Sequence, residues 1–120
     1  MKLLMRSGGE NYVGVSDVTV ASSWYMEKLG LHKVHLEMVD GEGCVALGFA
    51  HDEGALTIGP AGKPTEGLTP IIYAASAQKA REVLHSRGVT VGEIQQDRQH
   101  THYFEMRDPE GNVIEVCEEP

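Results

Sequence analysis

The chain passes twice through the same order of strand-like and helix-like segments, and the two passes lie about 58 residues apart. Gly30 and Gly88 each follow a helix-like segment and are 58 positions apart. The same offset separates Leu56-Thr57-Ile58 from Ile114-Glu115-Val116. A period of nearly half of the 120 residues favours one duplicated unit over a solenoid, whose repeats usually run about 20 to 50 residues. We therefore expect a single domain built from two similar modules.

Each module is predicted to hold one helix and four strands. In the first module the predicted strands are 10–16, 33–39, 43–49 and 54–59, and the helix is 20–29. In the second they are 69–74, 90–94, 101–107 and 112–118, with a helix at 76–87. The strands follow from two-residue alternation and the helices from 3.6-residue spacing. The sequence thus predicts an α+β fold with two βαβββ modules, 10–59 and 68–118, joined by a linker, 60–67, of turn-forming composition.

Both predicted helices are apolar on one side only. The apolar positions are Val20, Trp24, Tyr25 and Leu29 in the first helix, and Ala80, Val83 and Leu84 in the second. Asp17 and Ser76 are suited to cap the N-terminal ends. Helices of this kind cover one face of a sheet, which leaves the other face to be covered by the second module, another subunit or a ligand.

Composition excludes several classes of protein. The formal net charge is −8, from 10 Lys and Arg against 18 Asp and Glu, which argues against nucleic acid as a partner. Cys44 and Cys117 have no CxxC spacing, so we expect reduced, structural cysteines. No apolar run is long enough to span a membrane, and a cytoplasmic location is expected. For residues 1–9 the sequence is equally consistent with a flexible N-terminal segment and with a part of the fold.

The helix-free face can be assigned residue by residue from strand alternation. If Val13, Ile72 and Ile114 pack under the helices, their strand neighbours point to the other side. The resulting face holds mostly small and apolar residues together with Glu10, Tyr12, Thr57, Thr69, Tyr73, Glu115 and Cys117. An apolar concavity with a few polar groups is typical of small-molecule sites.

The most specific motif is the closing segment Asp108-Pro109-Glu110-Gly111-Asn112-Val113-Ile114-Glu115, a tight turn that leads into a strand. Together with the two-module pattern and the spacing from Asp17 through Tyr25 to Leu29-Gly30-Leu31, it resembles the vicinal oxygen chelate superfamily. This superfamily includes glyoxalase I, bleomycin-resistance proteins and extradiol dioxygenases. The resemblance covers residues 10–118 and implies modules that curl into a cup with the helices outside, assembled as a homodimer.

The resemblance also implies where a metal would be held. In metal-dependent members four strands supply His or Glu ligands, and these positions correspond to Glu10, Thr57, Thr69 and Glu115. Threonine hydroxyls are poor ligands for a divalent transition metal. Glu10 and Glu115 remain as candidate metal ligands, so we expect no cofactor, with a divalent metal as the alternative.

Other candidate groups are weaker. His102 occupies a position where many relatives carry a polar residue near the mouth of the cup, so it is a candidate ligand contact. Glu115 is a candidate general base, because an apolar cup would raise its pKa. No nucleophile motif such as GxSxG and no Gly-rich phosphate loop is present.

Two functions follow from these residues. The first is a small-molecule binding protein of the glyoxalase and bleomycin-resistance type, which holds a neutral or cationic drug-like or metabolite ligand without a complete metal site. Its predicted ligand contacts are Tyr12, Thr57, Thr69, Tyr73, His102 and Glu115. The alternative is a divalent-metal-dependent lyase, isomerase or transferase that uses Glu10 and Glu115. A purely structural module is a third possibility, favoured if the cup proves to be filled by its own side chains.

Overall fold

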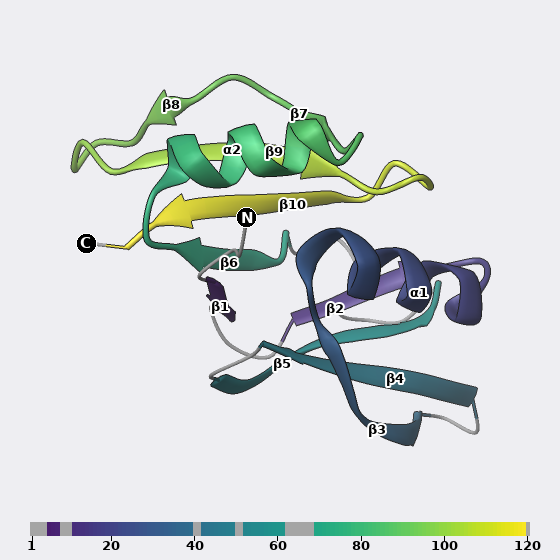
Figure 1. Ribbon diagram of the computed structural model, residues 1–120. Helices are drawn as coiled ribbons and strands as arrows, with labels where there is room; N and C mark the ends of the chain where they lie inside the picture. The colour runs from purple at the N-terminus through teal and green to yellow at the C-terminus, as the bar shows by residue number, and fades with distance from the viewer. Residues whose placement is uncertain (1–4, 8–10, 40–41, 50–51, 62–68, 120) are drawn as a thin grey trace.

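The computed structural model describes residues 5–7, 11–39, 42–49, 52–61 and 69–119 (Figure 1). The first module holds β2 (Asn11–Val15), α1 (Val18–Leu29), β3 (His32–Val39), β4 (Glu42–Phe49) and β5 (Asp52–Pro60). The second holds β6 (Ile71–Ala74), α2 (Ala77–Ser86), β7 (Thr90–Val91), β8 (Gln95–Gln96), β9 (His102–Arg107) and β10 (Val113–Glu118). A short strand, β1 (Met5–Ser7), precedes both. The predicted α+β class and the repeated strand–helix–strands order are confirmed.

The strands form two sheets, one for each module. The first sheet has the order β2-β5-β4-β3, and the second has the order β1-β6-β10-β9-β7, with β8 also paired to β9. In each module the opening strand runs parallel to the last strand, and the other pairings are antiparallel. The register places Tyr12 beside Thr57 in the first sheet and Ile71 beside Glu115 in the second.

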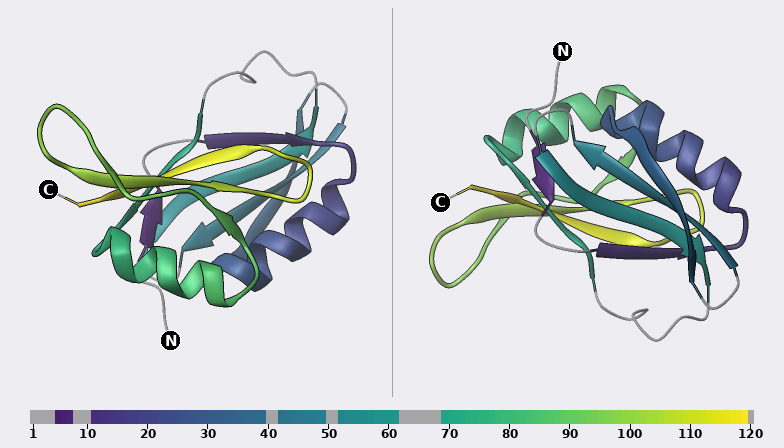
Figure 2. Two further views of the ribbon diagram at one scale, coloured as in Figure 1. Left: turned by 90° about the horizontal axis from the view of Figure 1, so that it is seen from above. Right: turned by 90° about the horizontal axis from the view of Figure 1, so that it is seen from below.

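Both helices lie on the same side of the sheets (Figure 2). The Asp17 carboxylate accepts a hydrogen bond from the Val20 N–H at 3.1 Å, and the Ser76 hydroxyl accepts one from the Lys79 N–H at 3.2 Å. Each residue thereby satisfies one of the N–H groups that a helix start leaves without a partner. Gly30 ends α1 in the left-handed conformation with φ of 71°, as its sequence position predicts.

The C-terminal ends of the two helices meet. Lys28 donates from Nζ to the carbonyl oxygen of Arg87, and Arg87 donates from Nη1 to the carbonyl oxygen of Lys28, each at 2.7 Å. The negative ends of two helix dipoles would repel, and these cations offset that repulsion. The exchange is reciprocal, and the two residues lie 59 positions apart, close to the repeat offset seen in the sequence.

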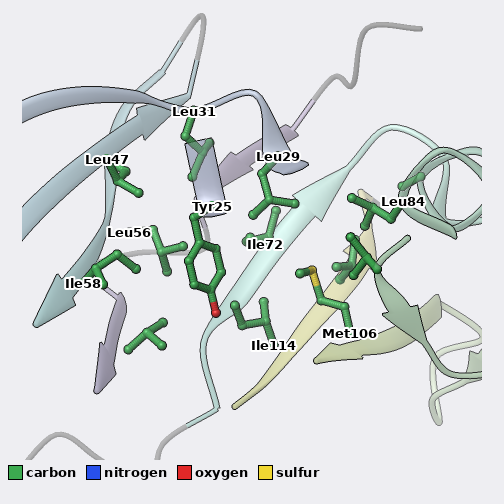
Figure 3. Close-up of a cluster of buried hydrophobic side chains, with 14 of the residues drawn as sticks. Tyr25, Leu29, Leu31, Leu47, Leu56, Ile58, Ile72, Leu84, Met106 and Ile114 are labelled. Atoms are coloured by element: carbon green, nitrogen blue, oxygen red, sulfur yellow. The ribbon is translucent and has the colours of Figure 1, made fainter. Parts of the chain in front are cut away.

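The core is one continuous cluster between the helices and the sheets. Figure 3 shows Tyr25 of α1 among Leu56 of the first sheet and Ile72 and Ile114 of the second. All four side chains are fully buried. The two modules therefore share their apolar interior, which explains why 120 residues fold without a disulfide.

The closing segment joins the modules through Asp108, which is buried. Its carboxylate accepts hydrogen bonds from the N–H groups of Glu110 and Asn112, from the Asn112 side chain and from the Tyr25 hydroxyl, at 2.8 to 2.9 Å. Burial and the adjacent Asp108 carboxylate raise the pKa of Tyr25, which keeps the phenol protonated. Gly111 has a φ of 88°, a turn conformation that glycine adopts without strain.

Three further hydrogen bonds run along the seam between β2 and the second module. Asn11 donates from its side chain to the Ile71 carbonyl, Asn112 donates to the Gly14 carbonyl, and the Ser16 N–H donates to Glu110. The start of β2 thus contacts β6, and its end contacts the turn that precedes β10. The closing motif therefore builds the inter-module seam as well as the turn into β10.

Some predicted boundaries change. Residues 5–7 form a strand that pairs antiparallel with β6, so this part of the N-terminal segment belongs to the fold. The predicted strand at 90–94 shortens to Thr90–Val91, and β8 is an additional short strand. Strand β6 begins at Ile71 and not at residue 69, because the preceding residue, Pro70, has no N–H to donate to a ladder. Most of the predicted linker lies outside the described residues. No helix in the described ranges is long and apolar enough to cross a membrane.

Candidate functional site

The helix-free face of the second sheet carries the side chain that the sequence singled out. Ile114 and Val116 of β10 are fully buried against the core, whereas Val113, Glu115 and Cys117 alternate with them and are only half-buried. Successive strand residues point to opposite faces, so these three side chains share the face that no helix covers. The predicted orientation of Glu115 is therefore confirmed.

Glu115 lies directly across from a second carboxylate, Glu105 of β9. The Glu115 N–H donates to Pro70 O at 2.9 Å, and the Glu105 carbonyl accepts from the Gly92 N–H at 2.8 Å. Their main-chain hydrogen bonds thus point away from each other, which defines a non-hydrogen-bonded antiparallel pair. In such pairs the Cα atoms are about 4.5 Å apart and the side chains approach closely.

The two neighbouring carboxylates affect the pKa values of groups on this face. Partial burial, the Glu105 carboxylate and Asp97 together raise the pKa of Glu115. Burial, Glu115 and Asp97 raise the pKa of the Cys117 thiol to about 11. Among the described residues, neither Glu105 nor Glu115 has a side-chain hydrogen bond or an ion pair. The face therefore holds two adjacent carboxylates that form no ion pair within the described residues, with Arg107 in the next row opposite Val113. The raised pKa keeps the Cys117 thiol protonated at neutral pH.

Aromatic rings flank the carboxylates. The register places Tyr73 of β6 and Tyr103 of β9 on either side of Cys117, in the row next to the two glutamates. The Tyr103 hydroxyl donates to the Gln95 side chain at 3.2 Å. On the other side of Glu115 the neighbour in β6 is the apolar Ile71. Carboxylates bordered by two tyrosines and aliphatic side chains are suited to bind a cationic or neutral aromatic group.

The corresponding face of the first sheet has a different character. Its position equivalent to Glu115 is Thr57, beside Tyr12. The Tyr12 hydroxyl donates to the Pro60 carbonyl at 2.7 Å, and its ring lies against Gly59 and Cys44. Cys44 and Ala46, on the same face, are almost fully buried. This face is thus partly filled by the protein's own side chains.

The structure groups some of the predicted site residues and separates others. Tyr73 and Glu115 share the second sheet's free face, and Tyr12 and Thr57 share that of the first. Thr69 is exposed and lies two residues before β6 begins. Glu10, the other candidate metal ligand, lies outside the described residues.

His102 does not lie on the face that carries Glu115. It alternates with Tyr103 and so lies on the side of Phe104 and Met106, the helix-covered side of β9. Its Nδ1 is 3.6 Å from the Glu118 carboxylate, which in turn accepts a hydrogen bond from the Ala77 N–H at the start of α2. Strand alternation thus turns His102 away from Glu115, so these two predicted ligand contacts do not share a face, and a ligand-contact role for His102 stays a prediction.

Two residues of this face were not singled out from the sequence, namely Glu105 and Tyr103. The alternation of the buried Phe104 and Met106 in the segment 101–107 was the available signal, because it places residues 103 and 105 opposite to them. Which strand β9 pairs with, and in which register, is a tertiary fact that the sequence pattern does not contain.

The residues do not fit the four-ligand metal site that the resemblance implies. The described part of the chain contains no group of three or more His, Cys, Asp or Glu side chains placed to hold a metal ion. Of the implied positions, Thr57 and Thr69 offer hydroxyls, which are weak ligands for transition metals. We therefore derive no chemical step through a metal.

The chain thus consists of two βαβββ modules that share one apolar core and leave one face of each sheet free of helices. Residues 11–116 match the family model described as the Glyoxalase/Bleomycin resistance protein/Dioxygenase superfamily. The chain belongs to this superfamily. A comparison with curated protein sequences gave no match.

Solved structures with the same fold include proteins of different roles. A superfamily member from Sphaerobacter thermophilus DSM 20745 has a TM-score of 0.76 at 22% identity, covering 92% of this chain and 95% of its own. TnmS3, an antibiotic binding protein from Streptomyces sp. CB03234, has a TM-score of 0.75 at 19% identity, with 92% and 93% covered. Lactoylglutathione lyase from Agrobacterium tumefaciens has a TM-score of 0.67 at 17% identity, with 92% and 91% covered. At these identities the likeness shows the fold.

Proposed function

We propose that this protein binds a small organic molecule, cationic or neutral and carrying an aromatic ring, on its helix-free face. The observation that carries the proposal is the Glu105–Glu115 pair, two facing carboxylates with no charge partner in the described chain. Like charges directly opposite each other in a sheet are destabilising. A bound cation would relieve this repulsion, and functional sites often retain such local strain.

The surroundings of the pair support the same ligand class. Tyr73 and Tyr103 supply aromatic surface on one side, and Ile71 and Val113 supply aliphatic surface. The net charge of −8 adds a general attraction for cations and disfavours anionic ligands. Superfamily membership supports a small-molecule role, and one relative of the same fold is named as an antibiotic binding protein.

The test is a thermal-shift screen at pH 7 with three matched aromatic series: amines, neutral amides and carboxylates. We expect amines to raise the melting temperature most and carboxylates not to raise it, because ligands that bind only the folded state stabilise it. Glu115→Gln should weaken amine binding about tenfold by calorimetry. Glu93→Gln removes the same charge at an exposed position and should leave binding unchanged.

Two outcomes would contradict the proposal. The first is equal binding of amines and carboxylates, and the second is identical affinities for the two variants. Stoichiometric retention of a divalent metal by untagged protein, lost in Glu115→Gln, would favour the metal-dependent lyase, isomerase or transferase instead.

A further inference from the structure

The phenol end of Tyr12 lies next to Gly59, a residue without a side chain. Gly14 of β2 is the cross-strand neighbour of Gly59 in β5, and Cys44 lies on the far side of Gly59 in β4. A Cβ atom at Gly59 would come within 2.8 Å of the Tyr12 Cζ atom and 2.6 Å of the Cys44 Sγ atom. Gly59 therefore leaves a slot in the sheet surface, and the phenol end of Tyr12 occupies it beside the Cys44 thiol.

Tyr12 is held in this position from one side and reached by solvent from the other. Its hydroxyl donates to the carbonyl of Pro60, the last residue of β5, at 2.7 Å. Tyr12 is half-buried, whereas Cys44, on the other side of Gly59, is 0% exposed. A side chain on the surface of a strand changes rotamer without moving the backbone. The ring can thus leave the slot while the sheet remains intact.

We propose that Tyr12 is a movable plug, and that its rotation opens a slot for one planar aromatic ring of the ligand. The aromatic ring already in the slot shows the shape and chemistry that the slot accepts. The identity of the occupant rests on the proposed function, whereas the opening of the plug does not. The competing explanation is a purely structural one, in which an aromatic side chain permanently covers a strand glycine.

Cys44 reports on the plug, because its thiol and the Tyr12 phenol both border the space above Gly59. In a Cys117→Ser background, iodoacetamide modification of Cys44 should proceed at a rate that hardly changes at low urea concentrations, as expected for a local opening. Tyr12→Phe removes the hydrogen bond to Pro60 and should raise this rate about fivefold. Tyr103→Phe, whose hydroxyl lies on the other sheet, is the matched control and should leave the rate unchanged.

A second pair of variants tests the slot without changing Tyr12. Gly59→Ala fills the slot with a methyl group and should expel the ring, so that Cys44 reacts more than tenfold faster while the circular dichroism spectrum stays unchanged. Gly43→Ala adds the same methyl group at the position before Cys44 in β4, where no atom other than those of its chain neighbours lies within 4 Å, and should leave the rate unchanged. If Gly59→Ala fails to fold, Tyr12→Phe still decides the question.

The occupant is tested with indole as the probe. In the Tyr12→Ala variant the slot is empty, and indole at millimolar concentration should slow the modification of Cys44 at least threefold. Absence of protection would overturn the slot as an aromatic site, even if the amine screen on the wild-type protein succeeds. Two observations together would overturn the plug itself. One is a rate of Cys44 modification that depends on urea as steeply as global unfolding does. The other is a Tyr12→Phe rate increase no larger than the change in the free energy of unfolding accounts for.

Discussion

The two modules share a scaffold and differ in what they present. Both have a capped helix over a parallel pair of first and last strands, and the C-terminal ends of their helices exchange hydrogen bonds. On the helix-free face, Thr57 in the first module stands where Glu115 stands in the second. Tyr12 fills the first face beside Gly59, whereas the second face displays two carboxylates and two tyrosines. The two modules thus share their packing, while one helix-free face is closed and the other is polar.

The helix-covered sides of the two modules also differ in polarity, but here the first module is the more polar one. The buried residues of α2 are all apolar, namely Ala77, Ala80, Val83 and Leu84. Those of α1 include Ser22 and Tyr25. Tyr25 bonds to Asp108 of the second module, so the first module depends on a polar contact with its partner. We infer that the second module is the more self-sufficient of the two.

The largest expected effect comes from breaking this polar contact. Asp108→Ala leaves the Tyr25 hydroxyl and the Asn112 side chain without their buried acceptor and removes two hydrogen bonds that shape the turn. We expect a loss of about 3 kcal/mol in the free energy of unfolding, measured by urea titration. Glu93→Ala, at an exposed position, should cost less than about 0.5 kcal/mol. A loss below about 1 kcal/mol for Asp108→Ala would show that the modules do not depend on this contact.

A smaller effect of opposite sign is expected at Ser22. Its side chain is 3% exposed, and its hydroxyl has no hydrogen-bond partner within the described structure. Ser22→Ala removes a buried polar group from α1 and leaves Tyr25 as its one buried polar side chain. The change should stabilise the protein by about 1 kcal/mol. Ser23→Ala, at the exposed neighbour, gains only helix propensity and should give less than half of this. Equal melting temperatures for the two variants would mean that the Ser22 hydroxyl is satisfied in solution.

Most of the fold could be predicted because repetition and alternation are local signals. The spacing of Val13 and Val15, and of Ile114 and Val116, sets which face each strand buries. The closing motif indicated the family because its turn needs Gly111 at positive φ and a carboxylate at Asp108 to order the loop.

The site could be predicted only in part. Glu115 was placed correctly by alternation along its own strand. Its partner Glu105 depends on how β9 pairs with β10, and His102, which was chosen by its family position, does not share a face with Glu115 because of strand alternation. The role of Tyr12 as a filler depends on Gly59 lying next to its phenol end, a diagonal contact between two strands that no single segment encodes.

The smallest effect concerns the carboxylate pair, and it depends on pH. The folded-state pKa of Glu115 is raised, so the folded state binds its proton more tightly than the unfolded state does. Stability from this group is therefore full at a pH below its unfolded pKa and falls as the pH rises through the folded pKa. Glu115→Gln should be more stable than the wild type by about 0.5 kcal/mol at pH 7, a value reduced by solvent screening, and the difference should vanish near pH 3.

The equivalent position in the first module is Thr57, and Thr57→Glu places a carboxylate there. No second carboxylate faces it, because the residue opposite in β4 is Ala46. Urea titrations at the two pH values measure the difference, with Glu93→Gln as the control. If the gain of Glu115→Gln persists at pH 3, it arises from packing and not from charge, and the contrast between the two faces loses its electrostatic basis.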